Sequence, residues 1–156
     1  MSEEREGVVV AVCVGPGGIP KHPVESVLLS ELGLAGDAHR RSFHGGPRQA
    51  LCLFALEDYR ALERDGVRTH GPGTFGENVV TEGLDYGALR PGDRLAIGDE
   101  ALVEIDDVRA PCNTLRPVDR RFPDLMVGRS GWKCRVLRGG DLRAGQRIRL
   151  ANDRDP

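Results

Sequence analysis

Aromatic residues are scarce in this chain of 156 residues: they make up 4% of it, and tryptophan occurs once. Because single-stranded nucleic acids bind largely by stacking on aromatic side chains, and because the arginines are scattered, we expect no nucleic-acid partner. No apolar run approaches the length that spans a bilayer, so we expect no membrane partner either. Because aromatic residues are so few, the core must consist mainly of Val, Leu, Ile and Ala.

The four cysteines include no C-x-x-C pair, so a structural zinc site is not expected. Cys13, Cys52 and Cys134 lie in apolar strand patterns, which predicts small core residues. The start of the chain, residues 1–6, is acidic and lacks the apolar segment of a signal peptide. Together these features predict a cytoplasmic protein with reduced thiols.

Two common catalytic loops are also missing. No G-x-S-x-G sequence occurs, so neither Ser42 nor Ser130 has the setting of a hydrolase nucleophile. The segment 128–132 (GRSGW) is a candidate phosphate-holding turn, because glycine amides and an arginine suit an anion. It lacks the Lys-Ser/Thr ending of a P-loop, which argues against nucleotide hydrolysis. Trp132 is expected to pack in the core.

Turn-forming residues are abundant: the chain has 21 glycines and 10 prolines without a collagen-like period, which predicts many turns between short strands. One helix is expected over Leu56–Arg64, closed by Gly66, and a short one over Pro123–Val127. The length predicts a single domain over residues 1–156, with a core at about 7–150 and frayed termini. Strands are predicted at 8–14, 24–29, 49–54, 79–81, 94–97, 101–105, 134–137 and 147–150.

This pattern predicts a mostly β fold: a closed or partly open antiparallel β-barrel with a few short helices. Turns are expected at 91–93 and 139–141. Three irregular loops, at 33–47, 71–78 and 109–116, are long or unusual enough to carry function. A barrel collects loops at its ends, so we expect these three loops to meet.

Cys112 has the most informative surroundings in the chain. It follows Pro111, which favours a helix start, and Arg109 and Arg116 flank it. Exposed helix amides and positive charges both stabilise a thiolate over a thiol. A thiolate binds soft metals or carries sulfur, whereas the alternative reading is a buried, inert cysteine.

The other two loops carry further candidates. His39 and His44 could bind a metal or titrate near neutral pH, or could hydrogen-bond the loop to itself. In the sequence Phe75-Gly76-Glu77-Asn78, Gly76 permits close backbone approach and the Asn78 amide can pair with the polar edge of a planar ring such as a pterin. The alternative is a simple turn, with Glu77 in solvent and Phe75 in the core.

Charge is unevenly distributed around a formal net charge of −2. Residues 1–108 carry 10 basic and 19 acidic groups, and residues 109–156 carry the other 12 of 22 basic and 5 of 24 acidic groups. The basic final third begins at the Cys112 motif, so an anionic ligand there is electrostatically reasonable.

These motifs, in this order, resemble the MOSC domain, the module named for the C-terminal part of molybdenum cofactor sulfurases, in its stand-alone bacterial form. The resemblance covers about residues 7–150. The matching segments are 33–39 (GLAGDAH), 44–46 (HGG), 75–78 (FGEN), 81–85 (TEGLD), 92–95 (GDRL), 109–112 (RAPC) and 126–132 (MVGRSGW).

The resemblance implies a closed, mostly β fold in which Cys112 is a molybdenum ligand or a carrier of sulfane sulfur. By the same analogy Asn78 and Arg109 would contact the pterin of the molybdenum cofactor (molybdopterin). The wider set of predicted cofactor contacts adds Phe75, Gly76, His39, His44 and Thr114. Pyridoxal phosphate is not expected, because in fuller sulfurases it belongs to a separate domain, and Lys21 and Lys133 are the two lysines present.

The leading hypothesis is therefore a cofactor-binding protein that reduces N-hydroxylated or N-oxide small molecules, with Cys112 on molybdenum. Relatives often add a helical or ferredoxin domain, and this sequence shows neither. A reductase would then need a separate electron-donor protein, and a homodimer is an assembly to test. The alternatives are a sulfur-transfer or cofactor-delivery protein with a persulfide on Cys112, and a non-catalytic small-anion binding module.

Overall fold

The structure, a computed structural model, describes residues 5–37, 50–109 and 113–151. Within these ranges it contains one α-helix, α1 (Leu56–Arg64), and three short 3₁₀ helices, η4 (Tyr86–Ala88), η5 (Asn113–Leu115) and η6 (Asp124–Met126). The strands are β1 (Glu6–Val14), β2 (His22–Val24), β3 (Ser26–Ser30), β4 (Gly33–Leu34), β5 (Leu51–Ala55), β6 (Val79–Glu82), β7 (Arg94–Ile97), β8 (Ala101–Val108), β9 (Trp132–Arg138), β10 (Gly140–Arg143) and β11 (Arg147–Leu150).

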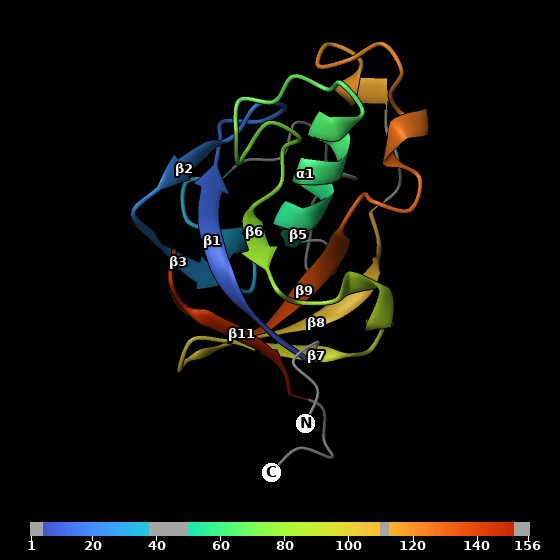
Figure 1. The fold of residues 1–156 in the computed structure, drawn as a ribbon. Coiled ribbons are helices and arrows are strands. Elements are labelled where there is room, and N and C mark those ends of the chain that lie inside the picture. The colour runs from blue at the N-terminus through green and yellow to red at the C-terminus, as the bar shows by residue number, and fades with distance from the viewer. Residues whose placement is uncertain (1–4, 38–49, 110–112, 152–156) are drawn as a thin grey trace.

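Seven strands close into a barrel in the order β1-β11-β7-β8-β9-β5-β6, and β6 pairs back onto β1 (Figure 1). The short strand β2 extends the other edge of β1, and β10, β3 and β4 form a small second sheet. The prediction of a mostly β barrel is confirmed. Closure leaves few free strand edges, which protects such a fold from edge-to-edge association.

One strand pair departs from the antiparallel prediction. β5 and β6 run parallel, with Leu53 opposite Val79 and Ala55 opposite Thr81. A parallel pair needs a crossover, and α1 supplies it. The helix begins with acids in its first turn and ends where Val67 N–H bonds to the carbonyl of Leu62, so its predicted bounds are confirmed.

The apolar residues form two layers. The barrel interior holds alternate residues of the strands, such as Val103 and Ile105 of β8. The outer layer lies between the barrel wall and α1, and it includes Tyr59 and Leu62. On β1 a register shift between Val9 and Ala11 breaks the two-residue period, so the strand supplies side chains to both layers.

Two local predictions need correction. Residues 139–141 were expected to be a turn, but β10 begins at Gly140 and pairs with β3. Glycine is disfavoured in strands and so hides such a segment from sequence analysis. The strand predicted over 24–29 is divided between β2 and β3 at Glu25.

Candidate functional site

The segment 71–78 is braced from within by a buried carboxylate. Glu77 is 0% exposed, and its carboxylate accepts hydrogen bonds from the Tyr59 hydroxyl, Gly73 N–H (3.1 Å) and Phe75 N–H (3.2 Å). Burial, with the Glu77 charge nearby, raises the pKa of Tyr59, so its hydroxyl keeps its proton and donates. The reading of Glu77 as a solvated turn residue is therefore wrong.

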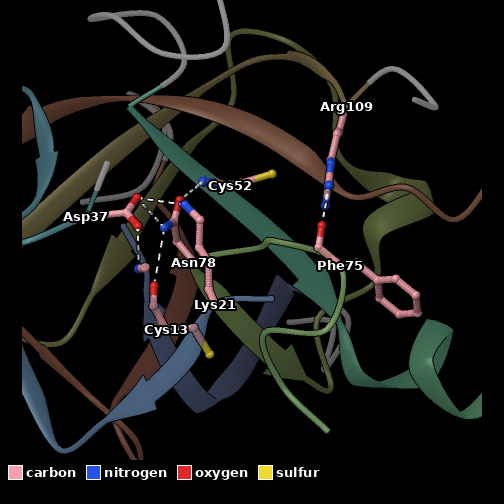
Figure 2. A network of polar contacts seen from close by, with 8 residues as sticks. Cys13, Lys21, Asp37, Cys52, Phe75, Asn78 and Arg109 are labelled. Atoms are coloured by element: carbon pink, nitrogen blue, oxygen red, sulfur yellow. Dashed lines mark hydrogen bonds and ion pairs between the residues drawn. The ribbon is translucent and has the colours of Figure 1, made fainter. Parts of the chain in front are cut away.

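Asn78, directly before β6, links that strand to both of its neighbours (Figure 2). Its backbone accepts from Cys13 N–H (2.6 Å) on β1 and donates to the Cys52 carbonyl (3.0 Å) on β5. Its side chain repeats both links: Oδ1 accepts from Cys52 N–H (2.9 Å), and Nδ2 donates to the Cys13 carbonyl (3.3 Å). The buried amide thus extends the strand pairing by one residue on each side.

A buried ion pair lies against this amide. The Asp37 carboxylate accepts from Lys21 Nζ (2.8 Å), from Asn78 Nδ2 (2.9 Å) and from Gly15 N–H (3.0 Å). The side chains of Lys21 and Asp37 are 7% and 3% exposed. Desolvating both charges is costly, and these extra hydrogen bonds help to offset that cost. Both N–H bonds of the Asn78 side chain are therefore used within the protein.

Arg109, which follows β8, reaches the same segment from the other side. Its Nη2 donates to the Phe75 carbonyl, and its backbone N–H donates to the Gly131 carbonyl (3.0 Å). Its Nη1 is buried and has no hydrogen-bond partner in the described part of the chain. Buried polar atoms in folded proteins are nearly always satisfied, so this one points to an acceptor that is not part of the described protein.

Gly76 allows this approach. Its φ is +78°, and a Cβ there would lie 2.9 Å from a methyl group of Ile19 and 3.8 Å from Arg109 Nη2. A larger residue would combine backbone strain with a steric clash, so the glycine predicted to permit close approach does so toward these two side chains.

Among the described cysteines, Cys13 and Cys134 are 0% exposed, as predicted, and burial raises the pKa of Cys13 to about 12. Cys52 is half-buried rather than a core residue, which corrects the prediction for it. Burial raises the pKa of Cys52, and the Arg109 charge acts in the opposite direction. Figure 2 shows the Cys52 backbone nitrogen beside Asn78 and the Cys52 thiol pointing away from that amide.

The predicted site residues are distributed as follows. Gly76, Arg109 and the carbonyl of Phe75 come together, and the Asn78 side chain lies in the separate network with Asp37. The Phe75 ring is 0% exposed and stacks on Phe54 (5.3 Å between centroids). Thr114 is exposed on η5. Cys112, His39 and His44 lie outside the described residues.

The contacts Asp37–Asn78 and Arg109–Phe75 show that the described parts of the three loops meet, as expected. Sequence reasoning missed the parts played by Lys21 and Cys52. The rarity of lysine was a signal that could have drawn attention to Lys21, which is one of two lysines in the chain. The described residues hold no cluster of three or more His, Cys, Asp or Glu side chains suited to a metal.

The geometry defines a β-barrel protein with a polar, arginine-containing site between three loops. Residues 40–149 match the MOSC domain, so this chain belongs to the MOSC domain family. It is 33% identical over 146 residues to "Protein YiiM" of Escherichia coli (strain K12), covering 88% of this chain and 65% of that protein. It is 32% identical over 134 residues to a protein named "Reductase" from Gibberella moniliformis, covering 80% of this chain and 23% of that protein.

Solved structures agree with this assignment. The crystal structure of YiiM from Geobacillus stearothermophilus has a TM-score of 0.75 at 27% identity, covering 94% of this chain and 75% of that one. The structure of YiiM from Escherichia coli has a TM-score of 0.73 at 29% identity, covering 94% and 70%. The chain spans 23% and 65% of the two curated relatives above. In the described ranges, no helix is long and apolar enough to cross a bilayer.

Proposed function

We propose that this protein binds the molybdenum cofactor and reduces small N-hydroxylated or N-oxide molecules, with the Cys112 thiolate as the protein ligand of molybdenum. Membership of the MOSC domain family and the relative named "Reductase" support the proposal. The net change for a hydroxylamine is R–NHOH plus two electrons and two protons, giving R–NH₂ and water. The cofactor, when bound, supplies the two-electron redox chemistry.

The observation that carries the proposal is the buried Nη1 of Arg109, which has no hydrogen-bond partner among the described residues. A buried guanidinium N–H seeks an oxygen acceptor, and the cofactor offers both a phosphate and a pterin carbonyl. Phe75 holds the other terminal nitrogen of this guanidinium, so the orientation of the group is set before a ligand arrives. The residues present therefore fit the group.

Asn78 has a supporting role in this proposal. Its side-chain amide is occupied by Cys13, Cys52 and Asp37, so we assign it to positioning the segment 75–78 rather than to direct contact with the pterin. Lys21 neutralises the Asp37 carboxylate within the same network, which leaves Arg109 as the described cation directed at an anionic ligand.

The proposal implies a small-molecule substrate and, for reduction, electrons from a separate electron-donor protein. Cys112 would have to be ionised to act as a ligand, and the neighbouring arginines favour that form. A labile mass increase of about 32 Da on Cys112, one sulfur atom, would instead favour the sulfur-transfer alternative.

The proposal is tested by the pterin content of Arg109→Gln, purified from a host that makes the cofactor. Loss of the guanidinium should lower the pterin fluorescence released per chain by about tenfold or more, the effect of about 1.4 kcal/mol in binding. Arg143→Gln, an exposed arginine on β10, is the matched control and should retain the wild-type content. Equal pterin in both variants would contradict the assignment of Arg109.

A further inference from the structure

A cavity lies next to the candidate site: Gly131 in its lining accepts a hydrogen bond from Arg109 N–H. The cavity has a volume of about 250 Å³ and opens between the start of α1, η4 and the segment 128–132. Tyr86, Leu89, Val108 and Trp132 supply its apolar lining. Phe75, Asn78 and Arg109 are not among the residues that line it.

The nitrogen donors that face this cavity are largely used within the protein. Arg129 donates from Nε to the Leu125 carbonyl (2.7 Å) and from Nη2 to the Asp65 carboxylate (2.7 Å). Trp132 Nε1 donates to the Tyr86 carbonyl (3.3 Å). Two of the three guanidinium nitrogens of Arg129 are therefore used within the protein, which weakens the reading of this segment as a phosphate-holding turn.

Arg90 is the remaining positive charge in the lining. Its Nη1 is held by two carbonyl oxygens, those of Gly87 (2.8 Å) and Leu89 (2.7 Å). This anchoring fixes the guanidinium against η4 at an exposed position, where solvent screens its charge.

Two oxygen-bearing groups in the cavity form no hydrogen bond with another described residue. The half-buried Asp58 carboxylate forms no hydrogen bond or ion pair with another described residue, although the charge of Arg129, also in the lining, acts on it. Ser130 is 4% exposed, and its hydroxyl forms no hydrogen bond with another described residue; its oxygen is not among the fully buried atoms that lack a partner, so it is open to the cavity. Both groups are therefore open to water in the cavity, and a ligand that brings N–H donors can replace that water as their partner.

We propose that this cavity binds a small, flat organic cation of the amidinium or amino-heteroaromatic class, with Asp58 as the anionic acceptor and Ser130 as a second hydrogen-bonding group. Tyr86 and Trp132 supply aromatic surface for the flat body of the ligand, and aromatic rings also attract cations. A mostly apolar lining with a few convergent polar groups is typical of small-molecule sites.

A purely structural role of Asp58 has to be separated from this one. Asp58 lies in the first turn of α1, where a carboxylate stabilises the helix through its dipole. Glu57 occupies the same turn but accepts from Gly83 N–H (2.8 Å) and does not line the cavity. Glu57→Gln is therefore the matched control for Asp58→Asn.

The test uses the full chain, purified without molybdate, and a probe series of benzamidine, benzamide and benzoate. Trp132 is the single tryptophan and lines the cavity, so its fluorescence reports on occupancy. Benzamidine should change the emission saturably, and the neutral and anionic analogues should bind about tenfold more weakly or worse. Asp58→Asn should remove the preference for benzamidine, and Glu57→Gln should keep it.

A flat titration with benzamidine, or equal affinity for benzoate, would overturn the proposal with the wild-type protein alone. An Asp58→Asn variant that is folded, as measured by circular dichroism, and still prefers benzamidine would also overturn the proposal. Because this assay needs no cofactor, its failure leaves the molybdenum proposal standing, and the failure of the molybdenum proposal leaves this one standing.

Discussion

At the scale of single residues, the site depends on polar side chains that take the place of backbone pairing. Asn78 supplies two side-chain hydrogen bonds that continue the pairing of β6 with β1 and β5. Asp37 then accepts from the same amide and from Lys21. Each buried polar group that loses its hydrogen bond lowers the stability of the folded state by about 1–3 kcal/mol. The network therefore holds the segment 75–78 in one position.

Asp58 provides a test of pH dependence at this scale. Burial raises the pKa of Asp58 above its usual value of 3.8, and the Glu57 charge adds to this, while Arg129 opposes it. For a carboxyl whose folded pKa is raised, the stabilising contribution is present below the unfolded pKa and is lost as pH rises through the folded pKa. Asp58→Asn should therefore gain stability relative to wild type as pH rises from about 3.5 to 7, since the variant carries no charge there to desolvate.

Urea unfolding of Asp58→Asn and wild type across that pH range measures the difference in free energy of unfolding. The lost helix-dipole interaction of about 0.3–1 kcal/mol moves the variant in the opposite direction. A difference that favours wild type increasingly as pH rises would show that the Asp58 carboxylate is stabilised in the folded protein and not strained.

At the scale of elements, the segment 71–78 joins α1, β2 and β6. Glu77 ties it to Tyr59 of α1, and Lys21 N–H, just before β2, donates to the Gly73 carbonyl (2.8 Å). The contact at Gly73 is so close that a Cβ there would lie 2.0 Å from the Lys21 carbonyl oxygen.

Gly73→Ala should therefore destabilise the protein more than Gly71→Ala. Both glycines have positive φ (+97° and +86°), so both variants carry a similar backbone strain of about 1 kcal/mol. Nothing lies within 4 Å of a Cβ at Gly71, so the difference between the two variants isolates the clash. Equal midpoints of urea unfolding for the two variants would contradict this account of the segment.

Elements could be predicted from sequence where the signal is local. The helix over Leu56–Arg64 follows from acids in its first turn, apolar residues at helical spacing and a terminating glycine. The parallel pairing of β5 with β6 could not be predicted, because a strand does not encode its neighbour. β10 was missed because Gly140 has low strand propensity.

The candidate site was predictable in part for the same reason. Asn78 and Arg109 stand out within short motifs. In the structure each contacts another of the three loops, Asn78 through Asp37 and Arg109 through Phe75. The Lys21–Asp37 pair joins residues 16 positions apart, and sequence spacing gives no reason to pair them. Phe75 was predicted as a cofactor contact; its ring stacks on Phe54 in the outer apolar layer, and its carbonyl accepts from Arg109.

At the scale of the whole molecule, several arginines of the final third form ion pairs with acidic side chains. Arg135 pairs with Glu104 (3.1 Å), Arg147 with Glu6 and Arg129 with Asp65. Exposed pairs of this kind contribute little to stability and are screened by salt. Arg109 is a member of this basic group whose guanidinium contacts the candidate site, through the Phe75 carbonyl.

The molybdenum content of the purified protein tests the central claim most directly. Wild type, Cys112→Ser and the control Cys52→Ser should be expressed together in a host that makes the cofactor, and metal per chain measured by mass spectrometry. We predict near-stoichiometric molybdenum in wild type and Cys52→Ser, and a background level in Cys112→Ser. Wild-type protein without molybdenum, or Cys112→Ser with an undiminished content, would contradict the account.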